Sequence, residues 1–204
     1  MAVEPQIPCR VCVYCKKGRY NFCPKTKFLA TPPTHGSLTR FFKHEADFCF
    51  KLPDNVSFEE ASLMEPLTVA VHACNRANFT VASTVLIVGS GPIGLTSILV
   101  TKAFGASKVI VTDVNQQRLN IAMDIGADHV LLIKGDGTNY AKKVAELLGR
   151  EPNFTFECSG TESGCRLAID VGIHSDWLLC TQQLKYINLN NRYISHHRQQ
   201  RLVE

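Results

Sequence analysis

Three absences narrow the functions that this sequence can serve. It has no run of about 20 apolar residues, which excludes an ordinary membrane-spanning helix. It has no N-terminal stretch in which a charged start leads into a long apolar run, so we expect no signal peptide. It also has no basic block, and its net charge of +4 (22 Lys and Arg, 18 Asp and Glu) gives no reason to expect nucleic acid binding.

The composition is that of a globular chain. Its 204 residues, 45% hydrophobic and 20% charged, suffice for one generous domain or two small ones. Without a secretion signal the expected compartment is the cytoplasm, where the nine cysteines stay reduced. Clustered thiols in such a compartment bind metal more often than they form disulfides.

Residues 85–113 carry the strongest motif. Val85–Val88 is a short apolar run typical of a parallel strand buried on both faces, and the six residues that follow fit G-x-G-x-x-G. In this motif the first glycine (Gly89) allows a tight turn, and the second (Gly91) lets the backbone approach a pyrophosphate. The third (Gly94) lets the next helix pack on the strand, and the free N–H groups at that helix start form an anion site.

An acid ends the second strand of this unit. Asp113 follows Lys108–Thr112 and lies 19 residues after Gly94, close to the spacing of the acid that hydrogen-bonds the adenosine ribose in dinucleotide-binding domains. The carboxylate favours NAD because it would repel a 2′-phosphate, whereas nearby Arg118 leaves NADP open. The alternative is a doubly wound domain that uses glycine for geometry only. The candidate cofactor-binding residues are Gly89, Gly91, Pro92, Ile93, Gly94, Asp113 and Arg118.

A second motif near the N-terminus predicts a metal site. Cys9, Cys12, Cys15 and Cys23 follow the spacing C-x2-C-x2-C-x7-C. Four soft thiolates in one loop suit tetrahedral zinc, and a site filled entirely by protein ligands is structural because substrate has no place in it. Two alternatives stay open. An iron–sulfur cluster can use a similar spacing. A redox C-x-x-C pair would normally open a helix in a thioredoxin-like βαβ unit, and the sequence pattern around these cysteines does not predict one.

The remaining pattern predicts an α/β fold. A capping-box sequence at Ser57–Glu60 precedes an expected helix over 66–76, and helices then alternate with strands, which indicates a parallel sheet of four strands with right-handed crossovers. After Gly172 we find no fifth strand and expect a disordered tail, which would leave strand 154–158 as an uncovered apolar edge. The other expected elements are strands 38–42, 48–52, 129–132 and 154–158 and helices 116–125, 138–148 and 162–171.

Four segments resemble, in order and spacing, the zinc-dependent medium-chain polyol and alcohol dehydrogenases. They are the cysteine loop, RFFKHEADFCFKLPDNVSFEEASLMEPLTVAVHAC, VLIVGSGPIGL and VTDVNQQRL, and the similarity covers about Val3 to Val171. The resemblance implies a partial GroES-like β-barrel domain with the structural zinc loop over residues 1–60. A partial Rossmann domain, with its doubly wound parallel sheet, would follow over 61–171, and residues 172–204 would be a tail outside the family.

The resemblance also implies an activity. Members of this family transfer a hydride from a secondary alcohol of sorbitol or a related polyol to NAD, with the alkoxide held on a catalytic zinc, and act as homo-oligomers. Glu65 matches the acid of the family's E-P motif, at or beside the catalytic zinc. Phe28 lies in a segment similar to one that lines the polyol pocket, and Asp113 and Arg118 match the adenosine-ribose contacts.

The sequence also departs from the family pattern at the catalytic zinc site. Its G-H-E and C-G-S-D motifs do not occur, and the segment that supplies the cysteine and histidine ligands of the catalytic zinc would lie before Met1. One acid does not hold a catalytic zinc, since such sites normally have three protein ligands. We therefore expect a fragment or alternative product that is inactive alone. Two other classes stay open: a non-catalytic module that binds zinc and dinucleotide, and an unfolded translation product.

Overall fold

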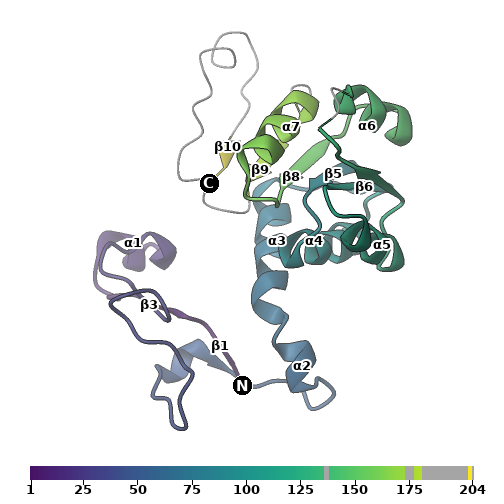
Figure 1. The fold of residues 1–204 in the computed structure, drawn as a ribbon. Helices are drawn as coiled ribbons and strands as arrows, with labels where there is room; N and C mark the ends of the chain where they lie inside the picture. The colour runs from purple at the N-terminus through teal and green to yellow at the C-terminus, as the bar shows by residue number, and fades with distance from the viewer. Residues whose placement is uncertain (136–137, 173–176, 181–201, 204) are drawn as a thin grey trace. The chain divides into compact units, whose positions relative to one another are not determined.

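The structure, a computed structural model, divides the chain into two compact units, Met1–Met64 and Glu65–Glu204 (Figure 1). It describes residues 1–135, 138–172, 177–180 and 202–203. The sequence analysis placed the border between residues 60 and 61, whereas the units meet between Met64 and Glu65. None of the helices in these described ranges is long and apolar enough to cross a membrane.

The first unit is built on two small antiparallel ladders. Strand β1 (Ala2–Val3) pairs with β4 (Cys49–Phe50), and β2 (Gln6–Ile7) pairs with β3 (Lys27–Phe28). Its helical segments are α1 (Val13–Lys16), the 3₁₀ turns η1 (Tyr20–Phe22) and η2 (Ala46–Phe48), and α2 (Phe58–Ala61).

The predicted capping box is confirmed at the start of α2. The Ser57 hydroxyl oxygen accepts a hydrogen bond from the Glu60 N–H, and the Glu60 carboxylate accepts one from the Ser57 N–H. Two of the orphan N–H groups at the helix start are thereby satisfied.

The strand expected over residues 38–42 is wrong. These residues form bends without ladder pairing, and the side chains of Leu38 and Phe41 are 103% and 88% exposed. An apolar run becomes a strand only where a neighbouring strand and a buried face are available, and the described part of this unit offers residues 38–42 neither. The strand expected over 48–52 is present but shorter, as β4.

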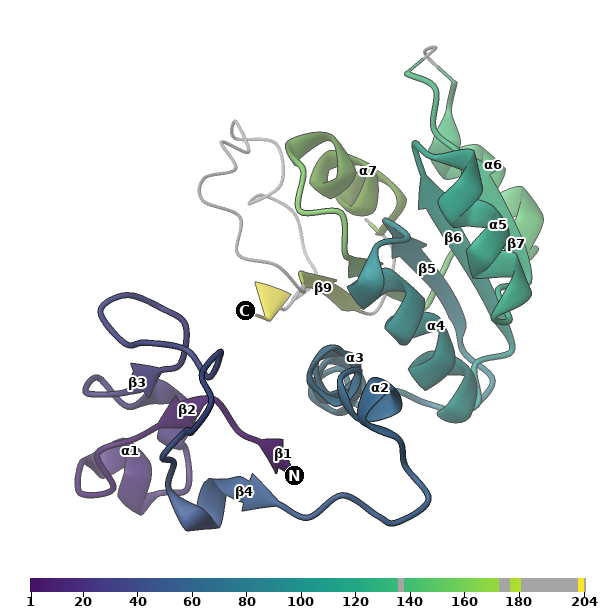
Figure 2. The same ribbon diagram turned by 60° about the horizontal axis from the view of Figure 1, so that its bottom comes forward.

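The second unit contains a six-stranded parallel sheet in the order β10-β9-β8-β5-β6-β7 (Figure 2). When β5 is counted as strand 1 and the sheet is read from β7 to β10, this is the doubly wound order 3-2-1-4-5-6. The strands are β5 (Thr84–Val88), β6 (Lys108–Asp113), β7 (His129–Leu132), β8 (Phe154–Glu157), β9 (Trp177–Cys180) and β10 (Leu202–Val203). The helices are α3 (Met64–Arg76), α4 (Pro92–Ala103), α5 (Gln116–Asp124), α6 (Tyr140–Leu148) and α7 (Glu162–Gly172).

Helices cover both faces of this sheet, which explains why β5 is apolar at every central position. Val85 and Ile87 belong to a core shared with α3, α4 and α5, whereas Leu86 and Val88 belong to a second core shared with α6 and α7. Figure 1 shows these two helical layers on opposite sides of the sheet. Successive strand residues point to opposite faces, so a strand between two layers must be apolar at both.

The absence of a fifth strand was also a wrong expectation. Trp177–Cys180 forms β9 and pairs in parallel with β8, with Phe154 opposite Trp177. The edge of β8 is therefore covered by main-chain hydrogen bonding, contrary to the uncovered edge that the sequence led us to expect. The four apolar letters of β9 lack flanking turn signals, which is why periodicity missed them. Apart from β9 and β10, residues 173–204 of the expected tail lie outside the described residues.

The glycines of the turn after β5 give a test of this fold. A Cβ on Gly94 would lie 1.9 Å from the Gly89 carbonyl oxygen, whereas a Cβ on Gly91 would meet nothing within 4 Å. We predict that Gly94→Ala lowers the free energy of unfolding by roughly 1–3 kcal/mol or more, because α4 must move off β5. Gly91→Ala, the matched control, should change it by less than about 0.5 kcal/mol. Urea titrations followed by circular dichroism measure both, and equal stability of the two variants would contradict the packing described.

Candidate functional site

A cavity of about 1110 Å³ opens at the carboxyl ends of the parallel strands in the second unit. Val88, Asp113 and Cys158, at or just beyond the ends of β5, β6 and β8, line it together with residues near the starts of α4, α6 and α7. In doubly wound folds ligands bind at this edge, where the strand order reverses. Here the reversal lies at β5, between β6 and β8.

The three glycines of the turn have different surroundings. Gly89 has φ +97°, and a Cβ on it would lie 2.7 Å from the Ser159 nitrogen, so the turn packs directly against the loop after β8. Gly94 touches the Gly89 carbonyl in the same manner. Gly91 lines the cavity and has open space where a side chain would be. The first and third glycines thus serve packing, while the second leaves backbone exposed to a ligand.

Helix α4 begins at this open backbone. Gly91 is its N-cap and Pro92 its first residue, and the N–H groups of a first helical turn have no partners within the helix. With the positive end of the helix dipole they suit an anion such as a phosphate. Five of the seven predicted cofactor-binding residues line the cavity: Gly89, Gly91, Pro92, Asp113 and Arg118. Ile93 and Gly94 are not among the lining residues.

The Asp113 carboxylate is held firmly at the cavity wall. Its Oδ2 accepts hydrogen bonds from the Ser90 N–H at 2.7 Å and the Ser90 hydroxyl at 2.8 Å, and its Oδ1 accepts one from the Asn115 N–H at 2.8 Å. Burial raises the pKa of Asp113, but these hydrogen bonds and the positive charge of Arg118 outweigh it, so the pKa is below its usual value. The carboxylate is therefore ionised at neutral pH.

The opposite wall contains residues that the sequence analysis did not name. Ser159 and Thr161, in the loop after β8, line the cavity, and the buried Glu157 carboxylate accepts hydrogen bonds from both the N–H and the hydroxyl of Ser159. Thr161 in turn donates its N–H to the Ser159 hydroxyl oxygen. Their position directly after a parallel strand next to the switch point was the signal that could have identified them.

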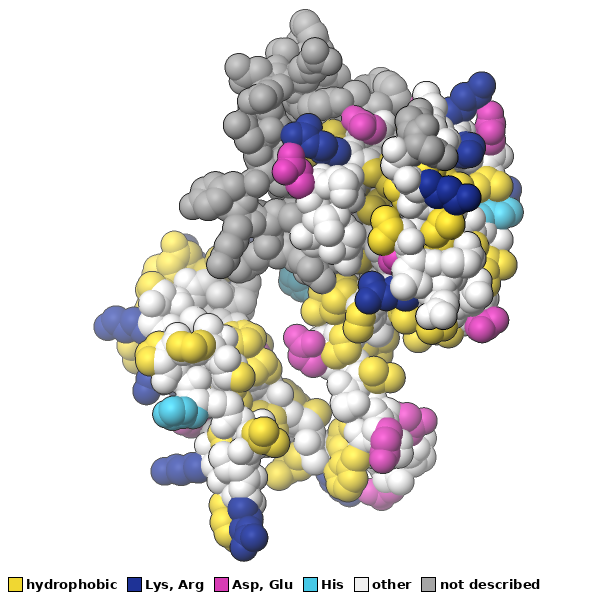
Figure 3. Space-filling model, in the orientation of Figure 1, with side chains coloured by type: hydrophobic (Ala, Val, Ile, Leu, Met, Phe, Trp, Pro, Cys, Tyr) yellow, Lys and Arg dark blue, Asp and Glu magenta, His cyan; other side chains and the backbone are white. Residues whose placement is uncertain are grey.

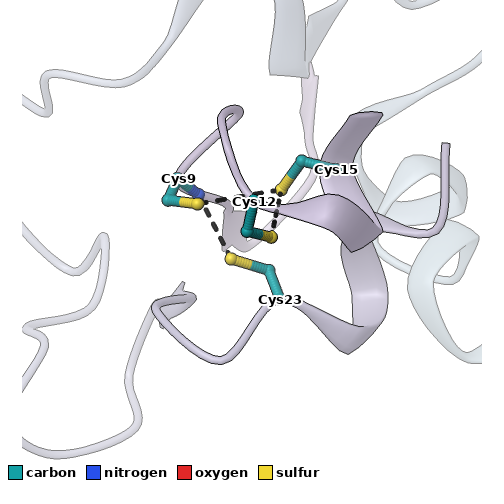
Figure 4. A group of neighbouring side chains, drawn as sticks. All are labelled: Cys9, Cys12, Cys15 and Cys23. Atoms are coloured by element: carbon teal, nitrogen blue, oxygen red, sulfur yellow. Dashed lines mark hydrogen bonds between the residues drawn. The ribbon is translucent and has the colours of Figure 1, made fainter. Parts of the chain in front are cut away.

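The first unit brings the four predicted cysteines together (Figure 4). Their sulfur atoms all lie within 4.8 Å of one another, with Cys12 and Cys15 at 3.4 Å and Cys9 and Cys15 at 4.0 Å. Four sulfurs around a tetrahedral zinc at about 2.3 Å would be about 3.8 Å apart. This spacing leaves room for one ion at bonding distance, which favours zinc over the iron–sulfur cluster that the sequence left open.

Two thiols of this cluster have pKa values shifted in opposite directions. Backbone N–H groups of Val11 and Cys12 lower the pKa of Cys9 to about 6, so that it is largely thiolate at neutral pH. Burial, together with hydrogen bonding to the sulfur of Cys12, raises the pKa of Cys15 to about 12. The Cys9 thiolate thus forms without metal, and a bound cation would supply the positive charge that Cys15 needs to ionise.

Arg10 anchors the metal loop to the rest of the first unit. Its guanidinium donates to both carboxylate oxygens of Asp47, at 2.6 and 2.8 Å, and lies 5.3 Å from the centre of the Phe48 ring. Arg10 has φ +65°, a conformation that L residues rarely adopt. The two-pronged contact with Asp47 holds Arg10, and with it the chain between Cys9 and Cys12, in that conformation.

The predicted catalytic and substrate residues lie in different units. Glu65 is exposed in the first turn of α3, and Phe28 is 43% exposed on β3. Over the described ranges, the four cysteines form the one cluster of three or more His, Cys, Asp or Glu side chains placed to hold a metal. Among the described residues, Glu65 therefore belongs to no set of three ligands of the kind that a catalytic zinc normally has.

The drawn face of the surface shows no separation of charge. In Figure 3 basic and acidic side chains of the described residues lie interspersed, with apolar side chains exposed between them. The exposed apolar residues include Leu38, Phe41 and Val11 in the first unit and Val114 in the second. On this face the described residues form no continuous basic patch of the kind that a polyanion would need.

Comparison with known proteins identifies a family and relatives to which the chain is similar. The family described as zinc-binding dehydrogenase matches residues 92–171, which begin at the first residue of α4 and include Asp113. Bovine sorbitol dehydrogenase is 50% identical over 170 residues, which is 83% of this chain and 48% of the bovine protein. Over the matched residues, the chain is similar to the zinc-binding dehydrogenase family. It spans about half the length of the curated dehydrogenases that it matches.

Solved dehydrogenases share the fold. Galactitol-1-phosphate dehydrogenase from Escherichia coli superimposes with a TM-score of 0.81 at 27% identity, covering 91% of this chain and 53% of the other. An Escherichia coli protein described as a short chain alcohol dehydrogenase, solved with the cofactor NADH, has a TM-score of 0.78 at 27% identity and covers 87% of this chain and 52% of its own. The predicted fold class, a Rossmann-type sheet preceded by part of a second domain, is confirmed.

The cysteine cluster gives a prediction that separates it from the other thiols. We expect the chain to bind one zinc ion and Cys23→Ser to lose it, because Cys23 is the buried member of the four. Cys49→Ser, which changes a half-buried cysteine of the same unit outside the cluster, should retain the ion. Zinc should also be released on acidification, since protons compete for the thiolates. Elemental analysis after gel filtration measures the zinc content per chain, and an equal zinc content in the two variants would contradict the site.

Proposed function

We propose that the second unit binds NAD in the cavity beside the glycine turn. The pyrophosphate would lie on the open backbone of Gly91 at the start of α4, and the adenosine ribose would donate a hydrogen bond to Asp113. The observation that carries this proposal is that one cavity contains both groups: an uncovered helix N-terminus and an ionised carboxylate. A negative phosphate and a hydroxyl-rich sugar need these two partners in adjacent positions.

We further propose that the whole protein to which this segment belongs is a polyol dehydrogenase. The 50% identity to a sorbitol dehydrogenase over 170 residues supports this substrate class. NAD, when bound, supplies the acceptor for a hydride leaving a secondary alcohol, which becomes a ketose. The contribution of the described residues is to bind and orient the adenosine half of the cofactor. Glu65 and Phe28 remain proposed contacts of the catalytic zinc and the polyol, and assembly into homo-oligomers remains a proposal from the family.

For the 204-residue chain alone, the geometry favours binding without turnover. The cysteine cluster uses all four ligand positions of a zinc ion for protein sulfur, which leaves none for an alcohol. The cavity, by contrast, can take a dinucleotide without any help from a metal. A non-catalytic module that holds structural zinc and NAD is therefore the second candidate function, and it applies to this chain in isolation.

Dinucleotide binding has a direct test. We predict that Asp113→Asn weakens NAD binding by roughly tenfold or more, because a ribose hydroxyl loses a charged acceptor. Asp124→Asn, an exposed acid at the end of α5, is the matched control and should leave affinity unchanged. Isothermal titration calorimetry of the zinc-loaded chain measures both. Because hydrogen bonding keeps the Asp113 pKa below its usual value, its contribution should be fully present above about pH 5 and lost only in stronger acid. NAD binding with the wild-type affinity in both variants would refute this placement of the ribose.

Turnover distinguishes the two candidate functions. With sorbitol and NAD, the 204-residue chain should produce no NADH, as measured by absorbance at 340 nm, while it still binds NAD in calorimetry. A full-length sorbitol dehydrogenase assayed in parallel serves as the positive control. Turnover by the chain at a rate near that of the control would show that the chain completes a catalytic site, and would overturn the binding-module alternative.

A further inference from the structure

Ser90 occupies an unusual position within the glycine turn. It lies between Gly89 and Gly91, its residue surface is 1% exposed, and it is not among the residues that line the cavity. Both of its donors, the N–H at 2.7 Å and the hydroxyl at 2.8 Å, point to the same oxygen, Oδ2 of Asp113. Asp113 does line the cavity. Ser90 therefore contacts the carboxylate from the side away from a ligand.

The hydrogen bonds of Asp113 show what remains for a ligand. An ionised carboxylate has about four acceptor positions, two on each oxygen. The two donors of Ser90 fill those of Oδ2, and within the described part of the chain Oδ1 accepts from the Asn115 N–H alone. The carboxylate thus keeps one acceptor position on Oδ1. Since Asp113 is only 8% exposed, its side chain cannot turn to offer a different edge without breaking buried hydrogen bonds.

We propose that Ser90 is a positioning residue that makes the cavity select NAD over NADP. This inference rests on the proposed function, because it concerns the ribose that Asp113 would hold. By fixing Oδ2, the Ser90 hydroxyl keeps the negative charge of Asp113 directed at the 2′ position of the ribose. A 2′-hydroxyl can donate to the remaining acceptor position, whereas a 2′-phosphate carries about −1.5 to −2 charges and accepts only.

Accommodating a 2′-phosphate requires the carboxylate to move away. Arg118, which is exposed and lines the same cavity, supplies the positive charge that a phosphate would seek once Asp113 had turned aside. The three hydrogen bonds on Asp113 oppose that movement, and two of them come from Ser90. Removing the hydroxyl eliminates one and leaves the backbone donor in place. The discrimination should therefore fall without loss of the fold.

Ser90→Ala tests this inference, with Ser97→Ala as the matched control. Ser97 is another fully buried serine of the same turn-and-helix segment, but its hydroxyl donates to the Ile93 carbonyl and makes no contact with Asp113. Calorimetry with NAD and with NADP on the zinc-loaded chain gives two dissociation constants for each variant. We expect Ser90→Ala to lower the ratio of the NADP constant to the NAD constant by roughly tenfold, the effect of one hydrogen bond to a charged group. Ser97→Ala should keep the wild-type ratio.

The ratio separates positioning from a merely structural role. A general loosening of the turn would weaken both dinucleotides equally and leave the ratio unchanged, which would overturn the inference. So would an equal change in the ratio for Ser97→Ala. Urea unfolding of each variant confirms that it is folded before binding is compared. If the wild-type chain bound neither dinucleotide, the proposed function itself would fail and this inference with it. Wild-type binding of NAD with an unchanged ratio in Ser90→Ala would remove only the role of Ser90.

Discussion

The carbonyl oxygen of Gly89 lies where a side chain on Gly94 would begin, at 1.9 Å from the position of its Cβ. Through this contact α4 sits against β5, and the position of α4 determines where its N-terminus points. Gly89 in turn touches the loop after β8 through the Ser159 backbone. These two glycines thus bring α4 and the ends of β5 and β8 to a single edge, and the cavity lies at that edge.

Two acid–serine pairs flank the turn and give this edge its polar character. Asp113 accepts from Ser90 on the side of β6, and Glu157 accepts from Ser159 on the side of β8. Each acid is the last residue of a buried strand and accepts a hydrogen bond from the backbone N–H of a loop residue, so that charge is placed where the apolar sheet ends. The first unit is stabilised differently. Its short ladders bury little surface, and its four cysteines supply a site for a stabilising metal.

Sequence predicted those parts of the fold in which local pattern and tertiary environment agree. The apolar letters of β5, the glycine spacing and the capping box at Ser57 each depend on neighbours in sequence, and each is present as expected. Residues 38–42 and β9 were misassigned because strand formation there depends on whether a distant partner is available, which periodicity does not report. In the candidate site the glycines and Asp113 were predictable from spacing. The role of Ser90 was not, since it comes from a contact with Asp113 that is 23 residues away in sequence.

The central claim is that the cavity beside the glycine turn is a dinucleotide site. The most direct test is an NMR titration of the zinc-loaded, ¹⁵N-labelled chain with NAD, in which backbone amide shifts report contact residue by residue. The account predicts saturable shifts at Gly89 to Gly91, at Ile93 and Gly94, at Asp113 to Asn115, and at Ser159 to Thr161, with no comparable shifts in the cysteine loop. Saturable shifts confined to other parts of the chain, or none at millimolar NAD in a folded sample, would contradict it.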